Sequence, residues 1–352
     1  MAKDNNIEEI YKYIQQFIDE NTLVTIGSGI SSAEGIPGMK NLASELGKEI
    51  PNRISSSESD ICKWNKIKDC LDKGSDLETA LTEIQASDNL DNVIKHVTYD
   101  YIRDFNMSIL SGVLNGKRSL KIISLLNHLM PRDNKELVII TTNYDCLIEY
   151  ACAIAGIDVD TLFYGTTIKR YQPDLMEKQH NRIEKNRRGL DIRTDYNFVK
   201  LLKPHGSLDW HSTPKDEFVN VSIYSPDTVE IITPGISKFR RERREPYNRI
   251  YNICNQEIDK AKRYLFLGYG FNDHDLQDHY EQNKNKGKPM LVVTKDLTDN
   301  ICNLYNETPT IMLVYQKNTG TNIKYKHSGT ETTQYITRKL WDIETLTKEV
   351  LA

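Results

Sequence analysis

The 352-residue sequence has little of several features that mark particular protein classes. Its six cysteines include no CxxC pair and no regular spacing, which excludes a zinc ribbon and fits a reducing compartment. Only 11 prolines and a 38% hydrophobic content exclude a disordered or collagen-like chain. Apolar runs stay well short of the roughly 18 residues that a membrane-spanning helix needs. Residues 1–6, MAKDNN, lack the apolar stretch of a signal peptide, so we expect a cytoplasmic protein.

A large excess of one charge is also missing. The formal net charge of −4 argues against a protein that coats nucleic acid. Two segments are nevertheless basic, and the first, residues 168–193, holds eight Lys/Arg against four Asp/Glu. The second cluster consists of Lys238, Arg240, Arg241, Arg243 and Arg244. Both are either solvated loops or contact surfaces for a partner, a nucleic acid or a dinucleotide phosphate.

The chain is long enough for about two units at roughly 150 residues each. Apolar spacing predicts a helix over residues 7–18 and a short buried strand over 23–26. Helical spacing then dominates from residue 55 to residue 130 and ends at a proline. We interpret residues 55–130 as a helical insertion within a core formed by residues 1–54 and 131–352.

Strand-like apolar runs return after the insertion, alternating with helical or glycine-containing stretches. They lie at residues 137–141, 198–202, 229–233, 264–267, 290–294 and 310–315. A further helix is predicted over 341–351. This alternation predicts an α/β fold with a Rossmann-like, doubly wound and mostly parallel sheet.

Four polar or glycine-containing motifs follow predicted strands, where ligands bind in open α/β sheets. They are GSGIS with EGIP (27–31 and 34–37), TTNYD (141–145), the His205-Gly206 pair and GYGFND (268–273). Each has a structural explanation when taken singly. A glycine turn needs no ligand, Asn and Asp cap helices, and a histidine at a strand end is often a structural hydrogen-bonding group.

In this order the four motifs resemble the sirtuin family, and more closely its bacterial sirtuin-like branch of antiphage NAD hydrolases, of the Thoeris type or associated with HerA. The resemblance spans residues 23–296. It implies that Asn143 and His205 are catalytic, that Asp145 contacts the nicotinamide carboxamide and that the backbone amides of residues 27–31 meet the pyrophosphate at a helix start. The residues that it assigns to dinucleotide binding are Gly27, Ser28, Gly29, Ile30, Ser31, Thr142, Asp145, Gly268, Tyr269, Asn272 and Thr294.

Two departures bear on the activity. The paired CxxC motifs that bind zinc in sirtuin deacetylases are missing, and Gly38-Met39-Lys40 stands where those enzymes carry Asp-Phe-Arg. Both departures favour simple NAD hydrolysis without a metal. Two other readings stay open: a protein deacylase or ADP-ribosyltransferase on the same fold, and a non-enzymatic NAD-sensing subunit whose basic loops bind a partner or DNA.

The residue chemistry fits cleavage of NAD to nicotinamide and ADP-ribose. Loss of nicotinamide passes through an oxocarbenium-like centre, so the site must orient the ribose and admit one water. The Asn143 amide suits a water or a ribose hydroxyl, and an imidazole such as His205 suits proton transfer near neutral pH. The resemblance further implies NAD depletion in abortive infection, a homo-oligomer, and a separately encoded partner such as a HerA-type ATPase or a short argonaute.

Overall fold

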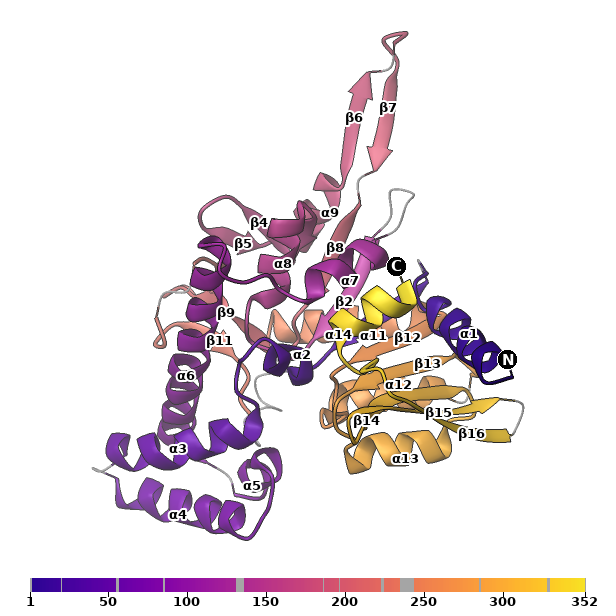
Figure 1. Ribbon diagram of the computed structural model, residues 1–352. Helices are drawn as coiled ribbons and strands as arrows, with labels where there is room; N and C mark the ends of the chain where they lie inside the picture. The colour runs from indigo at the N-terminus through magenta and orange to yellow at the C-terminus, as the bar shows by residue number, and fades with distance from the viewer. Residues whose placement is uncertain are drawn as a thin grey trace.

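A nine-stranded sheet forms the centre of the computed structural model (Figure 1). The structure describes residues 2–19, 21–54, 57–84, 86–130, 136–185, 187–195, 197–222, 225–234, 244–284, 286–327 and 330–351. The strand order is β16-β15-β14-β13-β12-β1-β2-β8-β3. The strands are β1 (Thr22–Ile26), β2 (Glu136–Thr141), β3 (Asp158–Asp160), β8 (Phe198–Leu202), β12 (Arg263–Leu267), β13 (Met290–Thr294), β14 (Ile311–Lys317), β15 (Gly320–His327) and β16 (Thr330–Ile336). All neighbouring pairs from β3 to β14 are parallel, whereas β14, β15 and β16 pair antiparallel.

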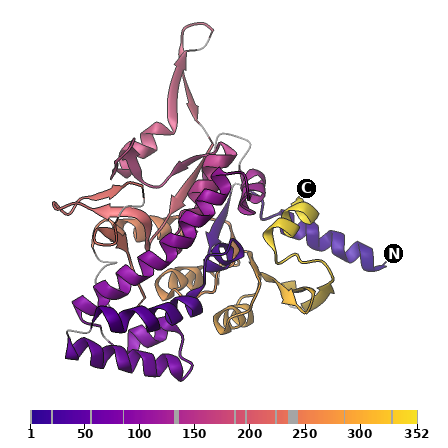
Figure 2. The ribbon, with the colours of Figure 1, turned by 60° about the vertical axis from the view of Figure 1, so that its left-hand side comes forward.

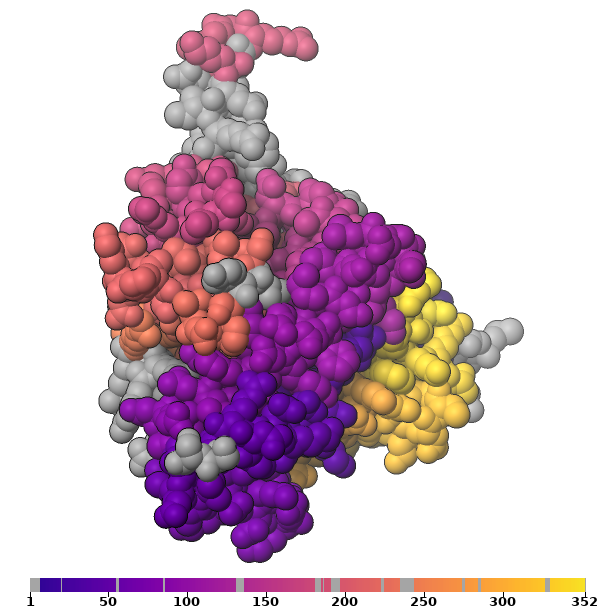
Figure 3. All heavy atoms as spheres, turned by 90° about the vertical axis from the view of Figure 1, so that its left-hand side faces the viewer, coloured from indigo at the N-terminus to yellow at the C-terminus, as the bar shows by residue number. Residues whose placement is uncertain are grey.

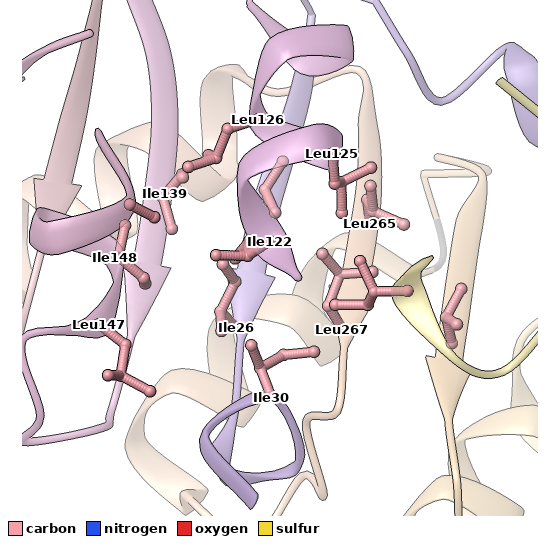
Figure 4. Close-up of a cluster of buried hydrophobic side chains, with 14 of the residues drawn as sticks. Ile26, Ile30, Ile122, Leu125, Leu126, Ile139, Leu147, Ile148, Leu265 and Leu267 are labelled. Carbon is pink, nitrogen blue, oxygen red and sulfur yellow. The ribbon is translucent and has the colours of Figure 1, made fainter. Parts of the chain in front are cut away.

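Helices cover both faces of this sheet because successive side chains of a strand point to opposite sides. In β12, Leu265 and Leu267 join one hydrophobic cluster, while Tyr264 and Phe266 join the other. The first face carries α1 (Ala2–Gln15), α7 (Ile122–Leu129), α8 (Leu147–Ala155) and α14 (Ile343–Leu346), which a π-helix (Thr347–Leu351) extends. Figure 4 shows α7 and α8 side chains packed against β1, β2 and β12. The second face carries α11 (Tyr247–Lys260), α12 (His274–Lys284) and α13 (Asp299–Glu307). The predicted doubly wound, mostly parallel fold is confirmed.

The helical part of the chain has its own hydrophobic cluster. It is built by α3 (Met39–Arg53), α4 (Glu58–Asp72), α5 (Leu77–Glu83) and the first half of α6 (Asp88–Leu114). Figure 2 shows α6 running from this layer toward the sheet, and its later residues Ile102 and Ile109 join the core. Packing thus groups α3 with the helical layer and α7 with the sheet. The insertion boundaries at 55 and 130 stay a prediction.

A second sheet has five strands. Its antiparallel strands are β11 (Val229–Ile231), β9 (Gly206–Ser212), β10 (Phe218–Asn220), β5 (Lys169–Tyr171) and β4 (Phe163–Gly165), in that order. In the space-filling view of Figure 3, the salmon-coloured atoms of this part of the chain lie against the purple atoms of the helical layer. The expectation that 229–233 belongs to the main sheet is wrong. The strand pairs with β9 instead. Gly206, at the start of β9, has φ +79°, and a Cβ at this position would lie only 2.1 Å from the Glu230 carbonyl oxygen. Glycine is therefore required for this close approach.

The basic segment 168–193 contributes to four elements. It includes β5, the helix α9 (Pro173–Gln179) and most of an isolated two-stranded ribbon, β6 (Asn181–Lys185) with β7 (Asp191–Asp195), which extends away from the rest of the chain in Figure 1. Residues 238–243 of the other basic cluster lie outside the described residues, while Arg244 pairs with Asp216 and Glu230. None of the helices in the described ranges combines the length and apolar character that a bilayer crossing requires.

The glycine turns after β1 and β12 are packed backbone against backbone. The Gly29 amide donates to the Gly268 carbonyl at 2.9 Å, and the Gly27 amide donates to the Leu267 carbonyl at 3.0 Å. A Cβ at residue 27 would lie 2.5 Å from both the Gly268 oxygen and the Tyr269 Cα. Only glycine fits this contact, which ties together the ends of two central strands.

We therefore expect Gly27→Ala to destabilise the protein by about 1–3 kcal/mol, because backbone atoms must move to admit the methyl group. The matched control is Gly47→Ala in α3, where a Cβ meets nothing within 4 Å. That change should stabilise by about 0.5–1 kcal/mol through helix propensity. Urea unfolding of the three proteins measures both effects, and equal stabilities would refute the packing argument.

Candidate functional site

An open cleft lies at the carboxyl ends of four adjacent strands of the main sheet. From β1 the chain passes to β2 and β8 on one side, and it later returns to β12 on the other side. The cleft is therefore at the topological switch point of the sheet, where open α/β folds bind ligands. The loops after β1, β2, β8 and β12 line it, so all four sequence motifs meet at one place.

Most of the predicted site residues line this cleft. They are Gly27, Ser28, Ser31, Thr142, Asn143, Asp145, His205, Tyr269 and Asn272. Gly29, Ile30 and Gly268 are not part of the lining but shape the two glycine turns beside it. Thr294 is not brought to the cleft, because its hydroxyl turns back to donate to the Asp296 carbonyl at 3.0 Å.

Asn143 is held by a hydrogen-bond network that joins the first two motifs. Its Nδ2 donates to the Gly27 carbonyl at 3.0 Å and to Ser31 Oγ at 2.8 Å. Ser31 Oγ in turn donates to Asp145 Oδ2 at 2.6 Å. Both amide protons of Asn143 are thus used within the protein. The atom that Asn143 can offer to a ligand is Oδ1, a hydrogen-bond acceptor.

The backbone amides after β1 are less available than the sequence predicts. The amides of Gly27 and Gly29 already donate to carbonyls of the β12 turn, and the Ile30 amide donates to the Gly27 carbonyl at 3.2 Å. The expectation that all the amides of residues 27–31 face a pyrophosphate is wrong for these three. The physical reason is that the N–H groups of these three residues already donate hydrogen bonds within and between the two closely packed turns.

His205 lies beside a carboxylate that the sequence interpretation did not assign. Its Nε2 is 2.8 Å from Asp273 Oδ2, and the two side chains are 12% and 5% exposed. The contact has the distance of an ion pair but does not meet the geometry of a hydrogen bond. Asp273 is the last residue of the GYGFND motif and precedes α12, so the motif itself could have indicated it.

The helical layer also contributes to the cleft, which sequence reasoning did not predict. Met39 and Leu42 come from α3, Glu78 from α5 and Ile102 from α6. No spacing rule connects these positions to the strand tips, because tertiary packing alone brings α3, α5 and α6 over the sheet edge. Met39, Leu42 and Ile102, together with Ile36, add apolar surface to the cleft wall.

A buried lysine supports the Asn143–Asp145 segment from behind. Lys203 has no exposed side-chain surface, and its Nζ donates to the Asp145 carbonyl at 2.6 Å, to Ser207 Oγ at 2.7 Å and to Glu149 Oε1 at 2.9 Å. Burial acts to lower the pKa of Lys203, but the Glu149 carboxylate together with Cys146, Asp209 and Asp145 outweighs burial, so the pKa is raised. Lys203 is therefore a buried cation that ties β8 to the loop after β2.

The same cluster contains the group of possible metal ligands found within the described residues. Ligand atoms of Cys146, Glu149 and Asp209 lie within 4.8 Å of one another. Lys203 already donates to Glu149, and burial raises the pKa of the Cys146 thiol well above its usual value. A thiol and an ion-paired carboxylate do not fit the anionic ligand set that zinc prefers.

One family model matches part of the chain. Residues 137–308 match the model described as a SIR2-like domain. Asn143, His205 and Asp273 lie within the matched residues. The search of curated proteins returned no matching sequence.

Solved structures of Sir2 proteins are similar at low identity. One, on the mechanism and regulation of Sir2 enzymes, is 13% identical with a TM-score of 0.39 over 86% of this chain and 90% of the other. One on sirtuin substrate affinity is 13% identical, with a TM-score of 0.41 over 94% and 92%. A Sir2 mutant with a p53 peptide and NAD is 12% identical, with a TM-score of 0.40 over 97% and 96%.

Replacement of Lys203 tests the support of the site. Lys203→Met should destabilise the protein by about 3–5 kcal/mol, because it leaves the Glu149 carboxylate and the Asp145 carbonyl buried without their donor. Lys48→Met is the control, since Lys48 is 68% exposed and pairs only with Glu45 of its own helix. That change should alter stability by less than about 0.5 kcal/mol. Urea unfolding is the measurement, and a stable Lys203→Met protein would rule out the supporting role.

Metal content is a second expected outcome. Purified protein should carry well below one zinc per chain by elemental analysis, because the cysteine pattern offers no ligand set and the Cys146 group is unsuited to zinc. Incubation with excess zinc followed by dialysis should leave the content unchanged. One tightly held zinc per chain would contradict this expectation and would reopen the deacylase interpretation.

Proposed function

We propose that the protein is an NAD glycohydrolase that cleaves NAD with water to nicotinamide and ADP-ribose. The observation that carries the proposal is the meeting of Asn143 and His205 in one cleft at the switch point of the sheet, both within the SIR2-like residues 137–308. The runner-up activities are protein deacylation and ADP-ribosyl transfer, which begin with the same bond cleavage. The missing zinc motif favours the hydrolase.

The proposed reaction breaks the bond between the ribose C1′ and the nicotinamide nitrogen. The bonding pair leaves with nicotinamide, a good leaving group that needs no strong acid, and positive charge develops on the ribose ring. Asn143 Oδ1 accepts from a ribose hydroxyl or from the attacking water and so orients it. The water oxygen bonds to C1′ while its proton passes to His205. ADP-ribose and nicotinamide are the products.

The surroundings of the pair suit this chemistry. Ile36, Met39, Leu42 and Ile102 give the cleft apolar walls, which limit bulk water around a reactive oxocarbenium-like centre. Asp145 remains the candidate for the nicotinamide carboxamide, although both of its oxygens already accept hydrogen bonds, from Ser31 Oγ and from the Leu147 amide. Its second role is then to hold Ser31 and thereby Asn143.

The biological setting is proposed from the sequence resemblance. It is NAD depletion in antiphage defence by abortive infection, carried out by a homo-oligomer in the cytoplasm with low basal activity. A separately encoded partner, such as a HerA-type ATPase or a short argonaute, would control it. The alternative of an NAD-sensing subunit predicts NAD binding without cleavage, so one assay of nicotinamide release with and without the partner separates the two.

The catalytic pair is tested by substitution. Asn143→Ala and His205→Ala should each lower NAD cleavage by about a hundredfold or more, and the double variant should be little worse than either single variant, because the step needs both groups. Nicotinamide release by wild type should not depend on an added acetylated peptide. His180→Ala, which removes an imidazole that does not line the cleft, is the matched control and should retain cleavage.

Thermal unfolding of the same variants separates chemistry from stability. A structural role for both side chains would cost roughly 1 kcal/mol at each site and would leave cleavage intact. Folded Asn143→Ala and His205→Ala proteins with wild-type cleavage would overturn the proposed mechanism. Release that requires the peptide would favour the deacylase.

A further inference from the structure

Asp273 is a charged residue of the cleft to which neither the motif comparison nor the proposed mechanism gives a role. It lines the cleft and its side chain is 5% exposed. A carboxylate this deeply buried loses hydration, which is costly unless other groups compensate for the charge. The ring of His205 provides a partner at 2.8 Å from Nε2 to Oδ2. The two residues come from loops after β8 and β12, on opposite sides of β1 and β2 in the sheet.

The contact orders the two nitrogens of His205. Nε2 is buried beside the Asp273 carboxylate. An ionised carboxylate has no proton to donate and acts only as an acceptor. A proton on Nε2 is therefore favoured, and Nδ1 becomes the nitrogen with the free lone pair. The ring of Tyr251 packs near the imidazole, with its centroid 6.4 Å from that of His205.

We propose that Asp273 is a positioning residue that acts through His205 in NAD cleavage. Its carboxylate holds the imidazole with Nε2 toward Asp273 and Nδ1 toward the cleft, and it stabilises the imidazolium that forms when Nδ1 takes the proton of the attacking water. The water oxygen bonds to C1′, and nicotinamide leaves with the electron pair of the broken bond. This inference rests on the proposed function.

A purely structural role for Asp273 makes a different prediction. Asp273 directly precedes α12, and its backbone carbonyl accepts from the Gln277 amide at 3.0 Å, as a helix N-cap residue does. Asn is as good an N-cap as Asp, but it carries no charge and its amide also donates. Asp273→Asn therefore preserves the cap and removes only the charged contact with His205.

The first experiment compares kinetics across a double-mutant cycle. Asp273→Asn should lower kcat at least about tenfold with KM changed less than about threefold, and Asp273→Asn combined with His205→Ala should be no slower than His205→Ala alone. Asp273→Glu, which keeps a carboxylate, should retain more kcat than Asp273→Asn. Wild-type kcat in a folded Asp273→Asn protein, or further loss in the double variant, would overturn the proposal.

The matched control is another buried His–Asp contact among the described residues. His180 Nε2 lies 3.0 Å from Asp160 Oδ2, with the side chains 15% and 5% exposed, and neither residue lines the cleft. Asp160→Asn should leave kcat and KM at their wild-type values. A similar loss in both variants would mean that removal of any buried carboxylate harms the enzyme, which contradicts a specific role for Asp273.

The second experiment does not need activity. Nitrogen-15 NMR of histidine-labelled protein at alkaline pH, with the His205 resonance identified from His205→Gln, should show the proton on Nε2 in wild type and a shift toward the other tautomer in Asp273→Asn. An unchanged tautomer would overturn the pairing even if NAD is cleaved. If wild type cleaves no NAD but the tautomer shifts, the pairing stands and the proposed function fails.

Discussion

The close contact between two glycine turns is the constraint on which the rest of the site depends. Gly27 and Gly29 after β1 meet Gly268 after β12 with no side chain between the backbones, and amide-to-carbonyl bonds join the two turns. This contact fixes the edge of the sheet at the switch point, so that the loops on either side open into one cleft. It also uses amides that would otherwise be available to an anion.

Buried polar contacts then hold the functional side chains in place. Ser31 Oγ accepts a hydrogen bond from Asn143 and donates one to Asp145, and the buried Lys203 donates to the Asp145 carbonyl. Such groups are costly to bury, and they persist because each finds a charged or hydrogen-bonding partner. The result is that Asn143 presents its oxygen and not its amide protons. An acceptor in a cleft suits hydroxyl groups, which ribose and water both provide.

The helical layer has a different relation to the cleft. Helices α3 to α6 share a hydrophobic cluster of their own, but α6 also continues into the core of the sheet. In addition, the Glu34 carboxylate, which follows β1 in the chain, accepts hydrogen bonds from the Arg118 side chain and from the Lys121 amide, both beyond α6. The layer is thus joined both to the sheet and to the loop that lines the cleft. A shift of these helices would therefore change the positions of Met39, Leu42 and Glu78 in the cleft wall.

The sequence by itself determined six strands of the central sheet and the four motifs that follow them, whereas β3, β15 and β16 were not predicted. The six are β1, β2, β8, β12, β13 and β14. Short apolar runs such as 23–26 and 264–267 are buried on both faces, and the carboxyl ends of parallel strands share one edge, so motifs such as TTNYD and His205-Gly206 had to meet there. Tertiary structure alone decided that 229–231 pairs with β9, that the Gly27 and Gly29 amides are occupied, that Thr294 turns away and that Asp273 lies beside His205. These features depend on contacts between residues far apart in the chain, whose distances and hydrogen-bond directions no local spacing encodes.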